Sequence, residues 1–460
     1  MTSPFVFPPV VSSSCRSSGR VIRLASALAM IATLSACGGG DWFGGKEDPP
    51  LPGTRVSILE HDRNLKPAND ASTDAIRLPA PEPNDSWPQA GGYSHHAMQH
   101  MVVNAVPKKV WSTNVGNGTA KRNRLMSEPV VADNVLYVID SSAEVSALDA
   151  QTGNTLWSVD LAPDYDEDES ILGGGVAIDN GRLYVTTGFA EVFALDPKTG
   201  KTLWQTTVPS PMRAAPAVNG GRVFVVTVDN KGLALAASDG RILWTHAGVE
   251  EATTLLTGPA PAVDNGVVLM PYTSGEIAAL RVDNGLPLWS DTVIAARRTD
   301  SAANLSDISA RPVIDNNRVY VIGHSGLMVS IDLRTGDRAW EVELSSLSQP
   351  WLAGKFLYAV TTDAEVVCID TTNGKILWVH QLAQWKDPEE HTGRILWTGP
   401  TLASDRLIVT GSNGELFALS PYDGSVLGKV SVSDGITLPP AVANNTLYFL
   451  NDAADILAFR

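Results

Sequence analysis

Three of the chain's eight histidines, His95, His96 and His100, lie close enough together in the sequence to suggest a metal site. Transition-metal binding needs side chains held in a fixed geometry, and the glycine-containing segment around these histidines does not supply one by spacing alone. We therefore predict no metal site there and assign the three imidazoles no role.

An acidic run, Asp164 to Glu169, alternates aspartates in the manner of a calcium-binding loop. However, Glu169 stands where such a loop has its invariant glycine, and Gly175 stands where it has its bidentate glutamate. The run is interpreted as a solvated acidic loop, and no metal centre is predicted for this chain.

The chain's 3 cysteines form neither a disulfide framework nor a zinc pattern. Cys37 follows a segment, residues 1–36, that carries arginines, no acidic residue and the apolar run Leu24 to Leu34. This run is shorter than the roughly 20 residues needed to span a bilayer, so it indicates a secretory signal. The alternatives are lipidation of Cys37 and ordinary cleavage after Ala36.

The motif Leu34-Ser35-Ala36-Cys37 resembles the lipobox of bacterial lipoproteins. The resemblance implies that Cys37 is lipidated and becomes the mature N-terminus, which anchors a soluble domain without a transmembrane helix. In proteobacterial lipoproteins an aspartate after the cysteine favours the inner membrane. Here Gly38 follows, so the resemblance implies a lipid-anchored protein of the outer membrane that faces the periplasm.

Composition predicts the organisation of the rest of the chain. Residues 37–86 combine the cysteine with a segment rich in proline and glycine, which indicates a semi-extended tether. Residues 87–106 form a connecting segment that is expected to pack on the following domain, residues 107–460. The formal net charge of −16 argues against nucleic acid as a partner.

Residues 107–460 consist of a repeated unit in which an alternating apolar run ends in a glycine turn. The turn glycines, which recur every 38 to 51 residues, are Gly153, Gly200, Gly240, Gly285, Gly336, Gly374 and Gly424. Four residues after the first six of them stand Trp157, Trp204, Trp244, Trp289, Trp340 and Trp378, whereas Gly428 takes that place in the seventh. This period is typical of the four-stranded blades of a β-propeller.

The two ends of the array predict the number of blades. The last unit, Leu447 to Arg460, stops before it reaches a tryptophan strand, and Val110-Trp111 is a tryptophan strand with no unit ahead of it. If this N-terminal strand completes the C-terminal blade, the ring closes without leaving a long open sheet edge. The predicted fold is therefore all-β, an eight-bladed propeller of four-stranded antiparallel blades.

Two further patterns within the repeat could carry chemistry. Glutamates recur at the start of the third strand, and a ring of carboxylates could bind cations, but solvated positions at hairpin mouths are the favoured interpretation. These residues are Glu144, Glu191, Glu276, Glu365 and Glu415. Cys368 occupies a position that is alanine in most units, so it is predicted to be a buried packing residue and not a nucleophile.

The unit Ala-Leu-Asp-x-x-Thr-Gly-x-x-Leu-Trp resembles the repeat of the quinoprotein propellers, those of the pyrroloquinoline-quinone dehydrogenases. Such enzymes place a vicinal cysteine pair, a calcium ion and an acidic base around the quinone. This chain has only Cys368 after Cys37 and no Cys-x-x-Cys-His sequence for haem attachment. We therefore expect no enzyme activity and no cofactor.

The lipobox, the proline-rich tether and the quinoprotein-type ring together resemble the BamB family of outer-membrane-protein assembly factors. The segment Ser-Trp-Pro-Gln-Ala-Gly-Gly at residues 86–92 is similar to that of the family, as is the loop at residues 305–312. In that family this loop binds a POTRA domain of the barrel-shaped assembly protein BamA. Asp307 matches the first acidic contact of the loop, and Ser309 replaces the second.

A second loop of the family, Leu-x-Leu-Arg, lies one blade earlier and also contacts the POTRA domain. Its counterpart here is residues 254–257, where Leu256 matches the second leucine and Thr257 replaces the arginine. An alternative match, Met212-Arg213, keeps the arginine but lies two blades from Asp307.

The function that the resemblance implies is scaffolding. The expected partners are a BamA-like barrel protein with POTRA domains, other members of the assembly complex, unfolded outer membrane proteins and, through the lipid, the membrane. A quinone-dependent dehydrogenase or a ligand-binding periplasmic propeller is the alternative.

Overall fold

The computed structural model describes residues 65–73, 76–121, 123–163, 173–251, 255–256, 258–295 and 307–460. The predicted signal, Cys37, most of the tether and the acidic run Asp164 to Glu169 lie outside the described residues. Residues 64–460 form one compact unit. No helix in the described ranges has the length and hydropathy to cross a membrane.

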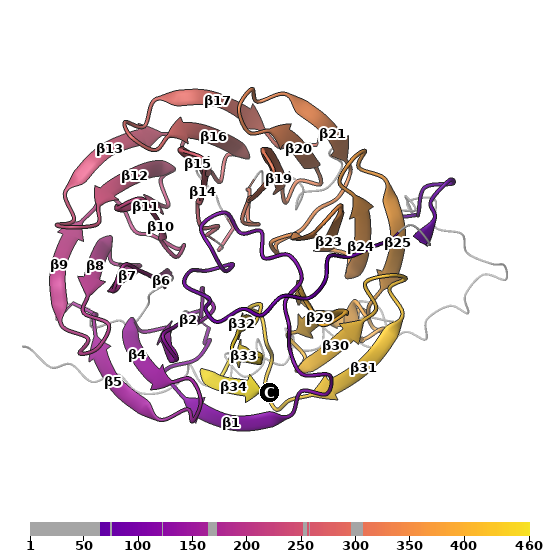
Figure 1. Cartoon of the computed structure of the whole chain (residues 1–460), viewed down its shortest axis with the longest axis horizontal. Helices are drawn as coiled ribbons and strands as arrows, with labels where there is room; N and C mark the ends of the chain where they lie inside the picture. Colours follow the sequence, from indigo (N-terminus) through magenta and orange to yellow (C-terminus); the bar gives the residue numbers. More distant parts are fainter. Residues whose placement is uncertain are drawn as a thin grey trace, which may run out of the picture. The chain divides into compact units, whose positions relative to one another are not determined.

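The described residues form eight four-stranded antiparallel sheets arranged as a ring (Figure 1). Blades 1 to 4 consist of β2 (Val130–Ala132), β3 (Val135–Ile139), β4 (Glu144–Asp149) and β5 (Thr155–Asp160); β6 (Gly174–Asp179), β7 (Arg182–Thr187), β8 (Glu191–Leu195) and β9 (Thr202–Thr207); β10 (Ala217–Asn219), β11 (Arg222–Val226), β12 (Lys231–Ala236) and β13 (Ile242–Ala247); β14 (Ala262–Asp264), β15 (Val267–Pro271), β16 (Glu276–Arg281) and β17 (Pro287–Thr292).

The remaining blades continue in the same order around the ring. Blades 5 to 7 consist of β18 (Val313–Asp315), β19 (Arg318–Ile322), β20 (Met328–Asp332) and β21 (Arg338–Val342); β22 (Trp351–Ala353), β23 (Phe356–Val360), β24 (Glu365–Asp370) and β25 (Ile376–Gln381); β28 (Trp397–Ala403), β29 (Arg406–Gly411), β30 (Glu415–Leu419) and β31 (Val426–Ser431). A separate hairpin, β26 (Trp385–Asp387) and β27 (Thr392–Arg394), lies between blades 6 and 7.

Blade 8 joins the two ends of the domain. Its strands β32 (Ala441–Ala443), β33 (Thr446–Leu450) and β34 (Asp455–Phe459) are completed by β1 (Lys109–Asn114), which pairs antiparallel with β34. Lys108 and Arg460 extend this pairing by exchanging two backbone hydrogen bonds of 2.9 Å. The predicted ring closure and the predicted eight blades are both confirmed.

The core lies between neighbouring blades. Each inner strand is almost wholly buried, whereas most outer strands alternate exposed and half-buried residues, as in the pattern of β9. Val145 of blade 1 and Val185 of blade 2 belong to one buried cluster. The blades therefore stack face to face through apolar side chains, which is the arrangement that alternating sequences favour.

The repeated tryptophans lie between their own blade and the turn of the next one. The indole N–H of Trp204 donates to the backbone oxygen of Ala237, and that of Trp244 donates to Val282. A Cβ atom on the turn glycine of the next blade would meet the indole at 2.5 Å for Gly240 and 2.6 Å for Gly285. The glycines thus serve both the positive φ of the turn and the close approach of the indole.

The same geometry explains why blade 7 has Gly428 in place of tryptophan. The indole of each blade packs on the turn between the third and fourth strands of the next blade. Blade 8 has no such turn, because its third and fourth strands are the two ends of the domain. An indole on β31 would have neither the glycine nor the carbonyl group that receives it elsewhere.

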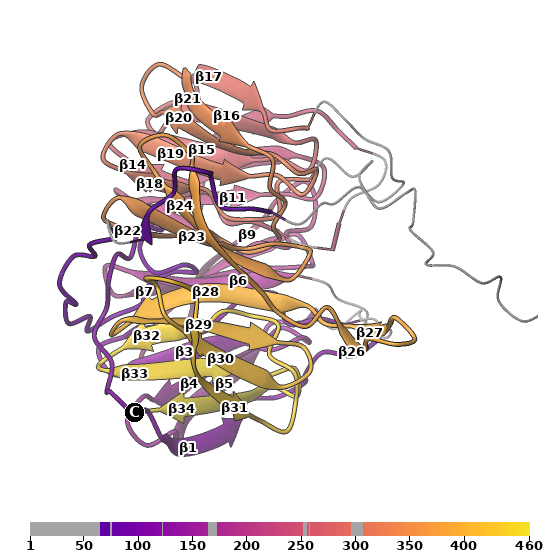
Figure 2. The ribbon, with the colours of Figure 1, turned by 90° about the vertical axis from the view of Figure 1, so that its right-hand side faces the viewer.

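We name the two faces of the ring by the segments that lie on them (Figure 2). The loop face carries the connections between blades and the hairpin β26–β27, which projects beyond the ring. The opposite, plug face carries the tight turns that follow the inner strands. Residues 84–103, here called the plug, cross the axis of the ring on this face (Figure 1).

The plug forms hydrogen bonds with all eight blades. Its partners lie on the inner strands or in the turns directly after them, in positions that would otherwise leave the edge of each sheet unpaired. In blade order the pairs are Trp87 with Val131, Pro88 with Ile178, Gln89 with Val218, Ser94 with Val263, His95 with Ile314, Gln99 with Gly354, Met101 with Ser404 and Asn84 with Asn444. The plug therefore acts as a shared edge partner for the inner strands.

Candidate functional site

Three successive connections on the loop face contain the residues that the sequence marked for partner binding. Met212 and Arg213 lie between β9 and β10, Leu256 lies between β13 and β14, and Asp307 and Ser309 lie just before β18. From the sequence, Met212-Arg213 and the loop with Leu256 are alternative matches to one loop of the family. In the structure Arg213 and the loop with Leu256 are neighbours in one cluster.

Backbone contacts hold this cluster together. The Arg213 guanidinium donates to the backbone oxygen of Leu255 at 2.8 Å, and the backbone N–H of Leu255 donates to Oδ1 of Asp307 at 3.0 Å. The connection that carries Leu256 is therefore held from one side by Arg213 and from the other by Asp307.

Asp307 is almost fully buried, with 1% of its surface exposed. Burial raises the pKa of its carboxyl group, while the backbone N–H of Leu255 and the charge of Arg213 oppose that rise. Its Oδ2 atom has no hydrogen-bond partner among the described residues. The side chain of Asp307 is thus placed to position the neighbouring loop and not to meet a partner directly.

The cluster differs in exposure from residue to residue. Met212 and Ser309 are buried, Arg213 is half-buried, and Leu256 is 44% exposed. Thr257 lies outside the described residues, as do Leu305 and Ser306 of the predicted docking loop. An exposed leucine beside a guanidinium group is an arrangement that can bind an apolar and acidic protein surface.

A buried ion pair crosses the ring axis, and nothing in the sequence pointed to it. Arg311, just before β18 of blade 5, donates a hydrogen bond of 2.9 Å from Nη1 to Oε2 of Glu128, just before β2 of blade 1, and its Nη2 forms an ion pair with Oε1 at 2.9 Å. Glu128 is 1% exposed and also accepts the backbone N–H of Gly91 in the plug. Because blades 1 and 5 face each other across the ring, this pair spans its centre.

Gln349 extends the network to a second part of the plug. Its side-chain oxygen accepts Nε of Arg311 at 2.9 Å, and its side-chain nitrogen donates to the backbone oxygen of His96 at 2.9 Å. Trp87 stacks on Trp351 with ring centroids 6.4 Å apart. The centre of the ring is therefore filled by protein groups, among which Arg311, Glu128 and Gln349 are hydrogen-bonded to one another or to the plug.

These groups do not fit a bound quinone. The ion pair at the axis is already neutralised and hydrogen-bonded, so its charges are committed to each other and to the plug. The sequence also lacks the cysteine pair of the quinone enzymes. We therefore derive no chemistry through a quinone.

The three histidines in the plug each have a backbone partner. Nδ1 of His96 lies 2.7 Å from the backbone oxygen of Pro312, and Nδ1 of His100 lies 2.8 Å from that of Pro79. Nδ1 of His95 accepts the backbone N–H of Ala97 at 3.0 Å. Within the described ranges, no three side chains of histidine, cysteine, aspartate or glutamate gather in a way that could hold a metal ion.

Cys368 and most of the repeated glutamates lie where the sequence placed them. Cys368 is fully buried, and burial raises the pKa of its thiol, so it is an unreactive packing residue. Glu144, Glu191 and Glu276 are half-buried at their hairpins. Glu365 differs, since it is 2% exposed and accepts the backbone N–H of Leu65.

His96 gives the domain a testable dependence on pH. Burial, together with the nearby charge of Arg311, lowers the pKa of His96 to about 3. Between that value and the ordinary pKa of about 6.5, only the unfolded chain binds the proton, so stability falls as pH decreases. From pH 6.5 to 5 we expect His96 to reduce the free energy of unfolding by about 1–2 kcal/mol.

Urea unfolding of the wild-type domain and of His96→Asn at several pH values checks this expectation. Asparagine tolerates the positive φ of residue 96 and does not titrate in this range. The variant should lose less stability between pH 6.5 and 5 than the wild type does. The exposed His391→Asn is the control; equal slopes for the wild type and His96→Asn would refute the assignment.

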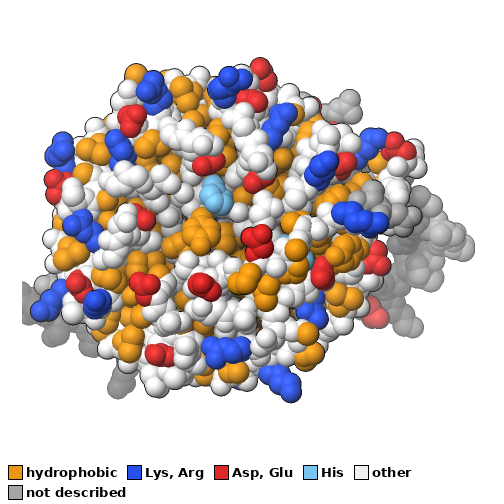
Figure 3. Space-filling view, viewed as in Figure 1, with side chains coloured by type: hydrophobic (Ala, Val, Ile, Leu, Met, Phe, Trp, Pro, Cys, Tyr) orange, Lys and Arg blue, Asp and Glu red, His pale blue; other side chains and the backbone are white. Residues whose placement is uncertain are grey.

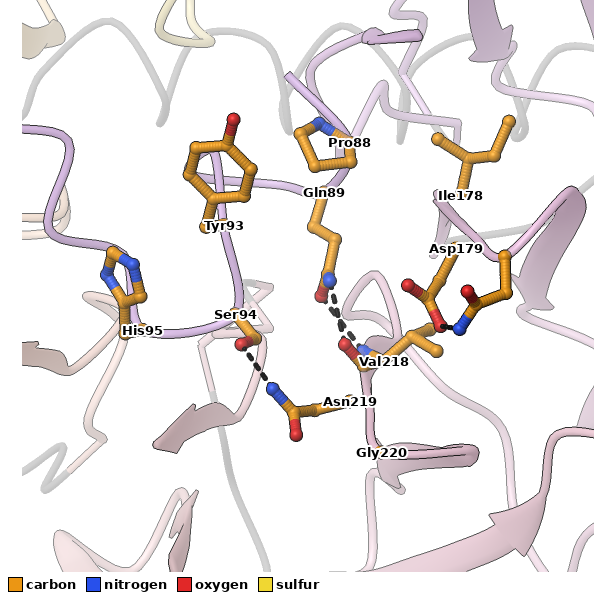
Figure 4. A pocket seen from close by; sticks show the side chains of 11 residues that line it. Pro88, Gln89, Tyr93, Ser94, His95, Ile178, Asp179, Val218, Asn219 and Gly220 are labelled. Atoms are coloured by element: carbon orange, nitrogen blue, oxygen red, sulfur yellow. Dashed lines mark hydrogen bonds between the residues drawn. The ribbon is translucent and has the colours of Figure 1, made fainter. Parts of the chain in front are cut away.

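A shallow pocket of about 310 Å³ lies on the plug face, between the plug and blades 2 and 3 (Figure 4). Many of its polar groups bond within its own wall: Gln89 exchanges two hydrogen bonds with Val218, and Asn219 donates to Ser94. Around it, acidic and basic side chains are interspersed over the face (Figure 3). The pocket therefore presents few polar groups that are free to select a ligand.

Comparison with known proteins gives both a family and a fold. A family profile described as "Outer membrane protein assembly factor BamB" matches residues 141–380, and one described as "Glucose/ethanol/alcohol dehydrogenase, beta-propeller domain" matches residues 103–178. BamB of Salmonella typhimurium is 31% identical over 345 residues, which cover 74% of this chain and 86% of that protein.

Two solved structures share the propeller. The structure of BamB from Moraxella catarrhalis superposes with a TM-score of 0.66 at 21% identity and covers 77% of this chain and 100% of that one. A europium-containing methanol dehydrogenase superposes with a TM-score of 0.64 at 16% identity and covers 80% of this chain and 89% of that one. At these identities the likeness shows the fold alone.

Proposed function

Since the chain belongs to the family of the outer membrane protein assembly factor BamB, we propose that it is a lipid-anchored scaffold that docks on a POTRA-bearing barrel protein. The family is one of assembly factors and is distinct from the quinone-dependent dehydrogenases that share its fold. Its role is therefore accessory to outer membrane protein assembly. The docking partner and the anchor are the finer parts of the proposal.

The observation that carries the docking proposal is the cluster of three connections on the loop face. Arg213 and Asp307 hold the backbone around Leu255, and the next residue, Leu256, projects an exposed apolar side chain. A surface that is already ordered loses little conformational entropy when it binds. In this proposal Leu256 and Arg213 contact the POTRA domain, whereas Asp307, Met212 and Ser309 support them from below.

The predicted anchor is consistent with docking through the same face. The first described residue, Leu65, donates its backbone N–H to Glu365 at the start of β24, on the loop face. Cys37 is the proposed lipidation site at the far end of the tether. A lipid anchor restricts the protein to the membrane surface and raises its effective concentration near an embedded partner.

Leu256→Asp tests the docking site most directly. A charge at the exposed centre of a contact should weaken binding by about 2 kcal/mol or more, which is roughly thirtyfold. The lipoprotein, tagged at its C-terminus, is recovered from gently solubilised outer membrane, and the barrel protein that accompanies it is quantified by mass spectrometry. Asp307→Ala should also lower recovery, because the backbone N–H of Leu255 loses its acceptor.

Leu288→Asp is the matched control, since Leu288 is 46% exposed but lies on β17, away from the cluster. It should leave recovery unchanged. Recovery of the same amount of barrel protein by Leu256→Asp and by Leu288→Asp would exclude the cluster as the docking site. Failure of the unmutated chain to recover any POTRA-bearing protein would refute the proposed function.

A further inference from the structure

The outer strand of blade 7, β31, differs from every other described outer strand. All six of its residues are exposed. Three of them are apolar, Val426, Leu427 and Val430, with exposed fractions of 49%, 54% and 50%. Each of the other described outer strands exposes at most one large apolar side chain. An apolar strand edge of this kind attracts another chain, and most proteins protect against it.

The absent tryptophan leaves a vacant position on this strand. Gly428 pairs with Ala418 in the register that joins tryptophan to a small residue in the seven other blades, for example Trp204 with Ala194. A Cβ atom at Gly428 would meet nothing within 4 Å. Ala418 is partly exposed as a result, whereas Ala194 is fully buried. The surface beside Gly428 can therefore receive an aromatic side chain from outside.

The usual protection of a strand edge by lysine is missing here. Lys429 is the only charged residue of β31, and its ammonium group lies 2.5 Å from Glu415 and 5.1 Å from the ring centroid of Phe417. The charge is therefore held against the blade's own surface. It does not shield the exposed edge.

Blade 6 shows how such an edge is covered in this fold. The chain's own residues 65–70 lie along its outer strand β25: Ala68 donates its backbone N–H to Ile376 at 2.9 Å, and Asp70 pairs with Lys375. Ile376 is 9% exposed, whereas Val426, which holds the equivalent position on β31, is 49% exposed. An extended segment thus covers one outer strand, and none of the described residues covers its neighbour around the ring in this way.

We propose that β31 is a docking strand for an extended segment of an unfolded β-barrel protein. Strands of such proteins alternate apolar and polar residues over about ten positions and carry aromatic residues near their ends. Backbone pairing with β31 would give affinity, the exposed valines and Leu427 would receive the apolar face, and the position at Gly428 would receive an aromatic ring. This inference rests on the proposed function, because that function supplies the class of client.

The test measures binding of a fluorescent peptide of about ten alternating residues, with one phenylalanine, to the full domain by anisotropy. The domain carries no C-terminal tag, because Arg460 ends in blade 8 next to β31 (Figure 1). Leu427→Lys should weaken binding about tenfold. Gly428→Trp should do the same, since its indole would take the open space beside residue 428 that the aromatic ring of the peptide is proposed to occupy.

The control variant is Leu203→Lys, at the equivalent position of β9, where the leucine is 49% exposed. It should bind the peptide as the wild type does. A peptide with proline at its centre should not bind, because proline removes a donor from the strand ladder. Equal affinity of all three variants, or no saturable binding, would overturn the proposal.

Two further measurements distinguish this inference from the proposed function and from the alternative that a second copy of the chain binds β31. The β31 variants should recover the POTRA-bearing protein normally, whereas Leu256→Asp should bind the peptide normally. If the wild type self-associates in sedimentation and Leu427→Lys abolishes this, then a second copy of the chain occupies β31 and the client proposal is wrong.

Discussion

Replacing Arg311 with methionine should lower the free energy of unfolding by about 3–5 kcal/mol, because it leaves the carboxylate of Glu128 buried and unpaired. Glu128 is 1% exposed, accepts a hydrogen bond from Nη1 of Arg311 and forms an ion pair with Nη2. Methionine preserves most of the volume of the arginine side chain, so the loss reports on charge and hydrogen bonding. Denaturant unfolding followed by tryptophan fluorescence measures it.

The double variant Glu128→Gln/Arg311→Met separates the charge from the packing. Glutamine keeps an oxygen for the backbone N–H of Gly91 and carries no charge. It should therefore recover about half or more of the stability that Arg311→Met loses, since the isolated charge accounts for most of the cost. If the double variant is less stable than Arg311→Met, then the packing of the two side chains, and not the unpaired charge, accounts for the loss of stability.

Trp244→Ala should destabilise the domain by about 3–5 kcal/mol, the range for removing a large aromatic side chain from a core. Trp244 is 8% exposed, packs against Phe224 with the two rings tilted by 43°, and donates to the backbone oxygen of Val282 in the next blade. The substitution therefore removes both a wedge between blades 3 and 4 and the bond that ties them. Trp385→Ala, on the projecting hairpin, is the control and should have a much smaller effect.

A double-mutant cycle with Gly285 tests whether the indole is the reason for the glycine. A Cβ atom on Gly285 would lie 2.6 Å from Trp244, and its φ is +69°. Gly285→Ala should cost the strain of positive φ plus this clash in the wild type, and only the strain in Trp244→Ala. We expect a coupling of about 1 kcal/mol or more; strictly additive effects would show that only the turn conformation requires glycine.

The blades could be predicted from the sequence because each depends on local chemistry. Alternation of apolar residues, a glycine turn and a tryptophan four residues later all occur within one unit. The eighth blade, which has no glycine turn, could also be predicted. Val110-Trp111 is a tryptophan strand with no unit ahead of it, and the last unit stops before a tryptophan strand. Only the reason for Gly428 required the structure, because it depends on a turn that the next blade lacks.

The centre of the ring and the docking cluster could not be predicted in the same way. Glu128 and Arg311 are 183 positions apart and meet only because blades 1 and 5 face each other. The sequence marked Asp307 as a contact residue, but it could not show that the carboxylate is buried beneath Leu255. Burial of a polar side chain in a loop depends on neighbouring loops, and those are set by ring closure.

The joining of β1 to β34 also determines when the domain can become complete. The chain is synthesised from its N-terminus, so β1 and the plug are made first, while their partners in blade 8 are made last. Contacts between such distant positions raise the contact order and slow folding. Until blade 8 is made, β1 lacks its partner β34 and Asn84 of the plug lacks its partner Asn444. The nascent chain therefore exposes unpaired strand edges during its translation and transport. It depends on protection against aggregation during that time.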